Sequence, residues 1–353
     1  MNIKKTKYRG ISKVRLVIFS LIGLVVVVLG VVVMKSITKP VLDLKEAETE
    51  CVYIPTGATF DDVRQLLLLQ DWLSDDMTFT FFAQWMNYIS NVKPGCYELR
   101  NGMTARELVT LLRSGNQKAQ KLTFNNVRQL QQLAGKVASV LECDSVEYLK
   151  AMTDEKLISE MGFKPETFAA MFIPNTYHIF WNTDGEEWVR RMKKEYDRFW
   201  NDERQRKADS LGLSRVEVST LASIIEEETN KRDEYPIIAG LYLNRLRIGM
   251  PMQACPTIKF ALGDFTKRRI LTKDLQVDSP YNTYINKGLP PGPIRVPSIQ
   301  VIDAVLNAVA HKYLYMCARP DGSGRHNFAT NGAEHARNAR IYQQELNKKK
   351  IYK

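Results

Sequence analysis

A run of three glutamates at residues 226–228 closes an apolar stretch and is the part of the chain best suited to acid–base chemistry. If the stretch is helical, Glu228 shares a face with the apolar residues three, four and seven positions before it. Burial on that face would raise the pKa of its carboxyl group, and a general acid working near neutral pH needs such a raised pKa. The same spacing also fits a helix end at which Glu228 turns to solvent or pairs with Lys231 or Arg232.

These glutamates belong to a predicted helix over Ser214–Asn230. Ser214 and Glu217 have the spacing of a capping box, which satisfies the free amide groups at a helix start. At about 100° per residue, one face of this helix is apolar and consists of Val218, Leu221, Ala222, Ile224 and Ile225. The first two glutamates of the run fall on the flank and the opposite face, so Glu228 is the one that the apolar face would bury.

The rest of the sequence excludes several other kinds of chemistry. It has no nucleophile elbow of the G-x-S-x-G type, no H-E-x-x-H motif and no phosphate-binding loop. The five cysteines form no C-x-x-C pair and the four histidines have no zinc-type spacing, so we expect neither a metal nor a cofactor. An odd number of cysteines also argues against a fold held together by disulfides.

The N-terminus predicts a single membrane anchor. Six lysines and arginines and no acidic residue occupy the first 15 positions, and the 19 residues Leu16–Met34 that follow carry no charge. A helix of this length spans about 28 Å, close to the thickness of a bilayer core. No Ala-x-Ala-like site follows, which favours an uncleaved anchor over a signal peptide. The positive-inside rule keeps residues 1–15 in the cytoplasm and places the rest outside the cytoplasmic (inner) membrane.

The charge balance indicates the neighbours of the exported part. The formal net charge is +11, and removing the six N-terminal positive charges leaves about +5, which fits an anionic surface such as lipid headgroups or an acidic wall polymer. Nucleic acid is not an expected partner outside the membrane, and no nucleic-acid motif is present. A polar tether over Lys35–Glu50, at most about 55 Å long, is expected to hold the remainder close to the bilayer.

Beyond the tether, the chain repeats a pattern at an offset of 45 residues. Cys51–Leu67 and Cys96–Leu112 each predict a short strand, a G-x-T turn and an amphipathic helix, in which Thr59 and Thr104 cap the helices. A LysM module begins in the same way, so residues 51–116 are predicted to form a LysM-like, glycan-binding α+β subdomain. A spacer or packing domain that binds no sugar fits the same pattern.

Residues 117–353 predict a larger, mainly helical domain with a cleft, which makes the fold class α+β. Helices are expected at Phe124–Val140, Ser145–Met152, Lys156–Met161, Glu186–Ser210, Pro236–Ile248 and Ser298–Ala310, and a β-hairpin at Tyr313–Ala318 and His326–Ala329. The aromatic segment Phe172–Thr183 fits either a sugar-stacking platform or side chains packed under a loop. The segments Tyr281–Tyr284 and Lys287–Pro293 predict stiff loops of the kind that lines a binding cleft.

Loops rich in Asn, Thr, Tyr and Pro next to a buried-face glutamate are typical of a carbohydrate cleft. A water-using glycosidase normally needs a second carboxylate about 5–9 Å from the acid. The available aspartates lie in no recognisable motif; they are Asp233, Asp264, Asp278 and Asp303. One acid without a partner fits a reaction in which the substrate supplies its own nucleophile.

Four segments closely resemble the YceG-like (MltG) endolytic murein transglycosylases. They are LASIIEEET (Leu221–Thr229), LYLNRLRIGMPMQACPT (Leu241–Thr257), SPYNTYINKGLPPGPI (Ser279–Ile294) and HNFATN (His326–Asn331). The resemblance runs from about Cys51 to the C-terminus. It implies a membrane-anchored enzyme that cuts nascent peptidoglycan strands between N-acetylmuramic acid and N-acetylglucosamine without water, leaves 1,6-anhydro-muramyl ends and limits strand elongation.

The resemblance also implies roles for individual residues. Glu228 matches the family's catalytic acid, which would protonate the leaving oxygen and then act as the base for the muramyl 6-hydroxyl. Glu226 matches a supporting glutamate, whereas Glu227 matches neither. Residues of the cleft or its support would be Asn244, Arg245, Gln253, Tyr281, Asn282, Thr283 and Asn331, although helix packing accounts equally well for Asn244 and Arg245. Asn175 departs from the family's pattern, which often has aspartate after this proline.

The sequence therefore predicts a lytic transglycosylase whose expected partners are peptidoglycan strands, the membrane and wall synthases. Two alternatives fit the same residues: a catalytically silent peptidoglycan-binding scaffold for wall synthases, and a muramidase that uses water and one of the four aspartates.

Overall fold

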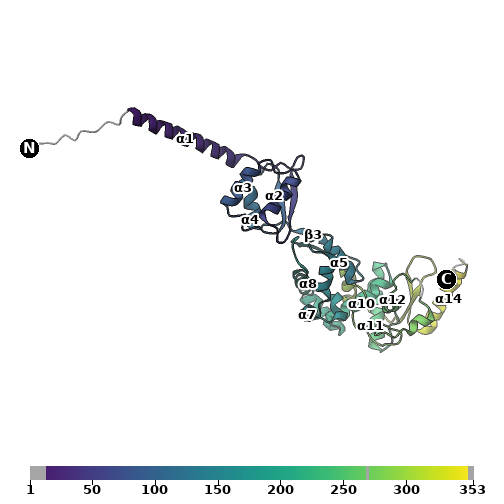
Figure 1. Cartoon of the computed structure of the whole chain (residues 1–353). Coiled ribbons are helices and arrows are strands. Elements are labelled where there is room, and N and C mark those ends of the chain that lie inside the picture. Colours follow the sequence, from purple (N-terminus) through teal and green to yellow (C-terminus); the bar gives the residue numbers. More distant parts are fainter. Residues whose placement is uncertain (1–12, 268–269, 349–353) are drawn as a thin grey trace, which may run out of the picture. The chain divides into compact units, whose positions relative to one another are not determined.

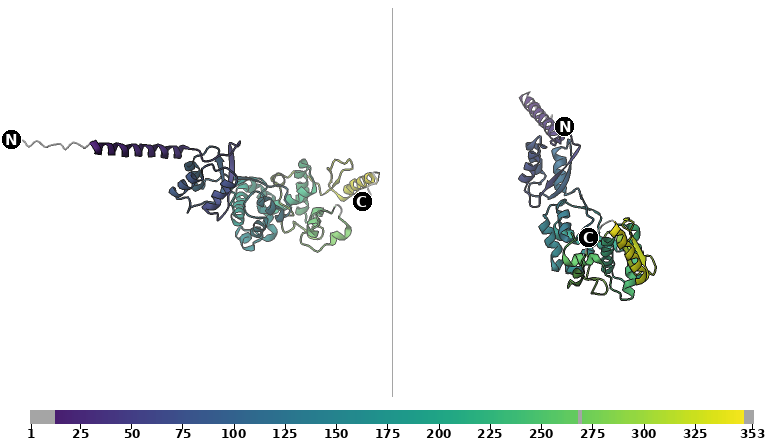
Figure 2. Two further views of the ribbon diagram at one scale, coloured as in Figure 1. Left: turned by 45° about the horizontal axis from the view of Figure 1, so that its top comes forward. Right: turned by 90° about the vertical axis from the view of Figure 1, so that its right-hand side faces the viewer.

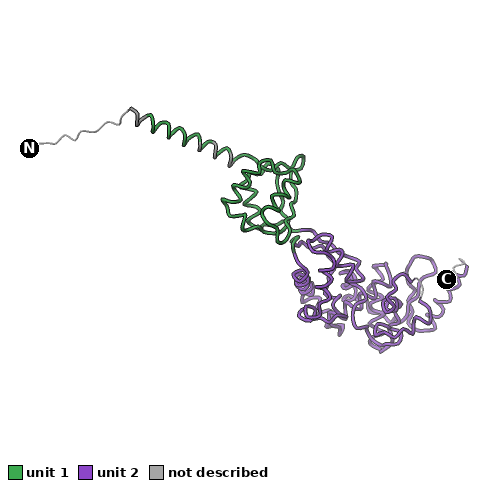
Figure 3. The backbone as a smooth tube through the Cα atoms, in the orientation of Figure 1, with its two compact units in different colours: residues 1–119, 180–182 green, residues 120–179, 183–353 purple. Residues whose placement is uncertain are grey.

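The computed structural model describes residues 13–267 and 270–348. The first twelve residues of the predicted basic N-terminus lie outside the described part. The chain divides into two compact units (Figure 3): residues 1–119 with 180–182, and residues 120–179 with 183–353. Both mix helices with small two-stranded sheets, so the expected α+β class is confirmed at this level.

The first unit is a small α+β body preceded by a helix (Figure 1). Its elements are α1 (Lys13–Thr38), β1 (Thr49–Ile54), α2 (Phe60–Leu69), α3 (Asp76–Trp85), β2 (Gly95–Arg100) and α4 (Ala105–Ser114). α1 includes the predicted anchor. Within the described residues, no helix has the combination of length and apolarity that a membrane span requires.

The predicted sequence repeat corresponds to two strand–turn–helix units that share one sheet. β1 and β2 pair antiparallel, with Thr49 opposite Arg100 and Ile54 opposite Gly95. Thr59 and Thr104 each close a capping box, at the start of α2 and α4 respectively, so these two caps are confirmed. Whether this body binds glycan, as a LysM module does, stays a prediction.

The packed part of the first unit begins earlier than the tether prediction allows. Val41, Leu42 and Leu44 lie inside the predicted tether Lys35–Glu50, yet all three are buried in the core of this unit. Leu42 also forms a β-bridge with Leu73. Apolar side chains in this polar stretch gain more from burial than from solvation, so only a few residues separate α1 from the core.

The second unit contains the remaining elements. Its helices are α5 (Leu130–Ala138), α6 (Ser145–Thr153), α7 (Glu155–Glu160), α8 (Gly185–Phe199), α9 (Asp202–Leu211), α10 (Arg215–Glu228), α11 (Tyr235–Arg247), α12 (Cys255–Leu262), α13 (Ile299–Leu306) and α14 (Gly332–Lys348). Two two-stranded antiparallel sheets complete it: β3 (Gln120–Thr123) with β4 (Thr176–Ile179), and the hairpin of β5 (Tyr315–Ala318) with β6 (His326–Ala329). The predicted β-hairpin is confirmed, and Figure 2 shows it beside α14.

Several predicted helix limits are wrong for local reasons. The single helix expected over Glu186–Ser210 is two helices, α8 and α9, because the side chain of Asn201 caps a new start by accepting from the Arg204 amide. The helix expected from Phe124 begins only at Leu130. In the aromatic segment Phe172–Thr183, Phe172 and Tyr177 are buried in the core whereas Phe180 is exposed, so packing accounts for only part of this segment.

Helix α10 crosses the core of the second unit and carries the three glutamates to its end. Ser214 and Glu217 form the predicted capping box at its start. Residues 218–225 are all buried, and the apolar ones among them belong to the main core cluster. The core thus fixes the direction in which the three glutamates leave the helix.

Candidate active site

Glu228 is the last residue of α10 and lines a cavity of about 420 Å³. The hydroxyl of Tyr242 on α11 donates a hydrogen bond of 2.9 Å to Oε1 of Glu228. Burial raises the pKa of the Glu228 carboxyl above its usual value, and Tyr242, His326 and Arg245 offset this only in part. A carboxyl group held in this way keeps its proton to higher pH, as a general acid must.

The cavity is built from the end of α10, from α11, from the loop before α12, from the loop around Tyr284 and from the β5–β6 hairpin with α14. Its lining is Glu228, Leu241, Tyr242, Arg245, Met252, Gln253, Cys255, Tyr284, Tyr315, Met316, Cys317, Ala318, His326 and His335. Apolar and aromatic walls surround a few polar groups, which is the usual composition of a small-molecule or sugar site.

Arg245 and Asn244, which the sequence predicts as supporting residues, differ in their positions. Arg245 lines the cavity, and its guanidinium donates to the backbone carbonyls of Leu314 (2.6 Å) and Met252. Asn244 points the other way, and its amide donates to the carbonyls of His311 (2.8 Å) and Tyr313. Together they fix the start of the hairpin and the loop before α12 to helix α11.

Gln253 lines the cavity and has a left-handed backbone, with φ at 51°. The backbone amide of Gln253 donates a hydrogen bond of 3.0 Å to the backbone carbonyl of Thr283. Asn282 and Thr283 are buried, and their side chains hold the loop in place: Asn282 donates to the carbonyls of Leu275 and Val277, and Thr283 accepts from the Ala254 amide. They therefore support the cavity wall instead of facing the cavity.

The remaining predicted residues lie apart from the cavity. Tyr281 packs on Phe260, with ring centroids 4.6 Å apart. Asn331 caps α14, since its Oδ1 accepts from the Glu334 amide at 2.9 Å. Tyr284, in the same loop as Tyr281, does line the cavity. The sequence analysis included it only as part of the stiff segment Tyr281–Tyr284.

Glu226 and Glu227 face a different set of partners, away from the described lining of the cavity. Glu226 accepts from the Ser298 amide at 3.0 Å and lies 3.4 Å from the Arg295 guanidinium. Burial opposes ionisation of Glu227, but Arg128 and Arg295 outweigh this effect and lower its pKa. Glu227 is thus held in its ionised form and Glu226 is held by the Ser298 amide, so only Glu228 has the environment of an acid.

No second carboxylate joins Glu228 among the residues that line the cavity. Asp233 pairs with Arg325, Asp303 pairs with Arg204, and Asp264 caps the turn at Thr266. In the described part of the chain, no group of three His, Cys, Asp or Glu side chains could hold a metal ion. The geometry therefore offers one carboxyl group with a raised pKa, without the second carboxylate that a water-using glycosidase normally needs.

Sequence reasoning missed two groups of the cavity. Tyr242 and His326 lie within two of the segments that resemble the family, LYLNRLRIGMPMQACPT and HNFATN, but the sequence analysis singled out neither as a site residue. His326 is held by Glu234, from which it is separated by 92 residues, so no local pattern links them. Only the folded chain brings both beside Glu228.

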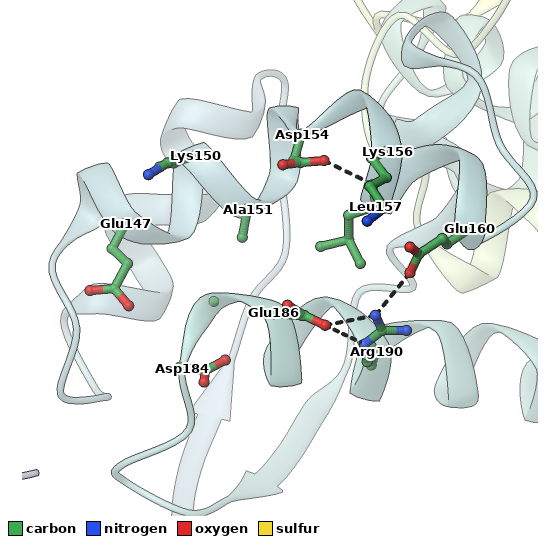
Figure 4. A pocket seen from close by; sticks show the side chains of 11 residues that line it. Glu147, Lys150, Ala151, Asp154, Lys156, Leu157, Glu160, Asp184, Glu186 and Arg190 are labelled. Atoms are coloured by element: carbon green, nitrogen blue, oxygen red, sulfur yellow. Dashed lines mark hydrogen bonds and ion pairs between the residues drawn. The ribbon is translucent and has the colours of Figure 1, made fainter.

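A second hollow, of about 540 Å³, lies between α6, α7 and the start of α8 (Figure 4). Mostly charged side chains line it, and Arg190 bridges Glu160 and Glu186 across its floor, as the dashed lines show. These ion pairs involve largely exposed groups and are worth little energy. Since every carboxyl group in the described lining of this hollow is exposed, the Glu228 cavity is the better candidate.

The chain matches the YceG-like family over residues 52–341. It is 28% identical over 305 residues to the endolytic murein transglycosylase of Bacillus subtilis, covering 82% of this chain and 83% of that one. It is also 28% identical to the endolytic murein transglycosylase of Streptococcus pneumoniae, covering 84% of this chain and 59% of that longer protein.

A crystal structure of a yceG-like protein from Listeria monocytogenes has a similar fold. Its TM-score is 0.55 at 28% identity, and the match covers 82% of this chain and 98% of that one.

The hydrogen bond from Tyr242 gives a direct prediction. Replacing Tyr242 by Phe removes a donor that stabilises the ionised form of Glu228, so the pKa of Glu228 should rise further. Loss of one hydrogen bond to a charged group should move the alkaline limb of the pH–rate profile up by about one pH unit. A limb that stays in place or moves to lower pH would contradict this account of the site.

Proposed function

The chain belongs to the YceG-like family, and from this premise we propose that it is a peptidoglycan lytic transglycosylase that cuts within glycan strands. The observation that carries the proposal is Glu228, a carboxyl with a raised pKa that faces a cavity without a second carboxylate in its described lining. Two relatives with 28% identity carry the name endolytic murein transglycosylase, which supports the same substrate class.

The proposed reaction needs only one protein acid to start. Glu228 donates its proton to the oxygen that links C1 of N-acetylmuramic acid to N-acetylglucosamine, and the bond from C1 to that oxygen breaks. The 6-hydroxyl of the same muramic acid then forms a bond to C1 and gives up its proton to a base. The products are a free N-acetylglucosamine end and a 1,6-anhydro-muramyl end, and no water is consumed.

We further propose that the enzyme works at the outer face of the cytoplasmic membrane. The uncharged segment Leu16–Met34 behind a basic N-terminus supports a single-pass anchor with the N-terminus inside. The strand–turn–helix body around β1 and β2 supports a LysM-like role, in which it binds the glycan strand. Cutting new strands at this place would limit their elongation, and wall synthases would be natural neighbours.

The test uses the full chain in detergent, incubated with uncross-linked glycan strands, and weighs the products by mass spectrometry. We expect fragments with anhydro ends, each lighter by one water than the corresponding reducing end. Reducing ends would overturn the transglycosylase in favour of a muramidase, and intact strands would favour a silent scaffold. A chain with Glu228→Gln, run in parallel, separates cleavage by this site from contaminating activity.

A further inference from the structure

Helix α3 presents an apolar stripe at the surface of the first unit. Met77, Phe81 and Trp85 follow one another at intervals of four residues, so they lie on one face of this helix. They are 84%, 62% and 67% exposed, respectively. Single apolar residues scattered over a surface need no explanation, but three in line on one helix face indicate an interaction surface.

The two aromatic rings of the stripe are held in place by the core beneath them. Phe82 is buried, and its ring makes edge contacts with the rings of Phe81 and Trp85, with centroids 5.6 and 5.7 Å apart. On the opposite face of α3, Phe79 and Ala83 are fully buried, so the helix cannot turn to hide the stripe. A partner that covers the stripe therefore finds it already ordered.

The start of α3 lies beside the end of α1. Asp75 is the N-cap residue of α3, and its carboxylate lies 3.9 Å from Nζ of Lys39, the residue directly after α1. The backbone amide of Ser74 donates to the carbonyl of Val41 at 2.8 Å. Figure 1 shows α3 next to the point where α1 enters this body. Since Val41 is already in the core, no extended tether separates the stripe from α1.

Helix α1 is apolar on every side. Five consecutive residues, enough for more than one full turn, are each more than half exposed: Leu24, Val25, Val26, Val27 and Val28. A helix that is apolar all round is normally covered, either by a large core or by a bilayer. The described residues of this chain leave these five side chains uncovered, which is consistent with the proposed anchor.

Placing the proposed anchor Leu16–Met34 in the hydrocarbon core sets the level of α3. The four residues between this segment and the end of α1 rise about 6 Å, close to the thickness of one headgroup layer. The start of α3 then lies at the level of the headgroups, where Trp and Phe side chains are favoured. Pairing offsets the acidic charge at this end of α3, because Asp75 pairs with Lys39 and Asp76 pairs with Arg64.

We propose that the stripe of Met77, Phe81 and Trp85 inserts into the interface of the phospholipid bilayer in which the chain is anchored. The three side chains reach below the headgroups, and α3 holds the first unit against the outer face of the membrane. The inference rests on the anchor in the proposed function and adds a second membrane contact, on the body that the anchor carries. A body held at two points keeps one orientation relative to the bilayer.

The test places the full chain in phosphatidylcholine vesicles, with and without lipids that carry bromine on the upper part of their acyl chains. The emission of Trp85 is obtained as the difference between the parent and Trp85→Phe. We expect brominated lipid to quench this emission about twofold or more, as for a tryptophan at the membrane interface. The matched control is Trp181→Phe, because Trp181 belongs to the same unit but packs against Tyr53 of β1, with ring centroids 5.2 Å apart. The emission of Trp181 should not respond to bromine.

A second variant changes the stripe and keeps the reporter. Phe81→Glu places a charge at an exposed position, so the fold should persist, but moving this charge into the interface is unfavourable. Trp85 should then return to water, so its quenching should be lost and its emission should shift to longer wavelength. Strand cleavage in detergent should equal that of the parent, because Phe81 lies outside the described lining of the Glu228 cavity.

Flotation of the vesicles separates the stripe from the anchor. A parent chain that floats with the vesicles while Trp85 stays unquenched would overturn the inference and leave the anchor and the cleavage reaction intact. A parent chain that does not float would overturn both the anchor and the inference. Unquenched Trp85 emission that changes on addition of glycan strands would assign the stripe to sugar binding, and unquenched Trp85 in a cross-linked dimer would assign it to a second copy. Either result would overturn the inference.

Discussion

Replacing Glu228 by Gln is expected to lower strand cleavage by about 10³-fold or more while the fold stays intact. Gln fills the same volume and can still accept from the Tyr242 hydroxyl, which now donates to Oε1 at 2.9 Å. It has no proton to give to the leaving oxygen, so the first step of the reaction fails. The measurement is the release of fragments from glycan strands, with near-ultraviolet circular dichroism as the check on the fold.

The same variant should be more stable than the parent at neutral pH. The pKa of Glu228 is raised in the folded state above its model-peptide value of 4.5 because of burial. Below pH 4.5 the carboxyl is protonated in both the folded and the unfolded chain, so Gln and Glu should be nearly equivalent. As the pH rises through the folded-state pKa, the parent loses the stabilisation of its folded state that comes from holding this proton more tightly than the unfolded chain does. The Gln variant has no such proton to lose. The melting-temperature difference should therefore grow from acid to neutral pH.

A Glu228→Gln chain that cleaves at the parental rate would refute the assignment of the acid. A chain that is inactive and also less stable at every pH would mean that Glu228 is mainly a structural group. Glu217→Gln is a suitable control, because Glu217 lies on the same helix but closes the capping box at its exposed start. It should cost about 1 kcal/mol or less of stability and leave cleavage unchanged.

Local rules placed Glu228 on the apolar face of its helix but left open whether it turns to solvent, and the resemblance to the family then matched it to the catalytic acid. The capping box at Ser214 fixes where α10 begins, and the spacing of apolar residues fixes which glutamate shares their face. Neither step needs knowledge of any other part of the chain. The same reasoning gave the two caps at Thr59 and Thr104 and the hairpin after α13.

The surroundings of the acid could not be predicted in this way. His326 and Glu234 are 92 residues apart, and Arg295 lies 68 residues from Glu227. Helical phasing says which direction a side chain takes but not which chain segment it meets there. The residues taken from the matched motifs show the same limit, since Gln253 and Arg245 line the cavity while Asn282 and Thr283 lie buried behind its wall.

The predicted boundaries of the long helix and of the tether are wrong where a few side chains change the local structure. Asn201 ends the predicted long helix because its short side chain caps a new one. Val41, Leu42 and Leu44 are buried in the core of the first unit, so this stretch is not the extended tether that was expected. A prediction that averages hydrophobicity over many residues does not detect the effect of such single side chains, although each effect has a simple physical cause.

The second large effect is expected at Arg295, which is the cation that orients the end of α10. Its side chain is 7% exposed. Nη1 donates to Glu227 at 2.6 Å, Nη2 donates to Asn126 at 2.6 Å, and Nε lies 3.4 Å from Glu226. This one buried guanidinium thus faces both glutamates that precede the acid. Removing it leaves two largely buried carboxylates short of a counter-charge, which is far more costly than losing an exposed pair.

We therefore expect Arg295→Met to lower the free energy of unfolding of the second unit by about 3 kcal/mol or more. Arg128→Met is the matched control: Arg128 makes two hydrogen bonds to the same Glu227, but its side chain is 41% exposed. Water already screens that pair, so its loss should cost about 0.5 kcal/mol. Urea titrations followed by tryptophan fluorescence measure both values at one pH. Equal losses would mean that burial does not set the strength of this network, and that the direction of Glu228 is fixed by the apolar core alone. If the large difference is found, cleavage by Arg295→Met at low urea should also fall, because the end of α10 carries the acid.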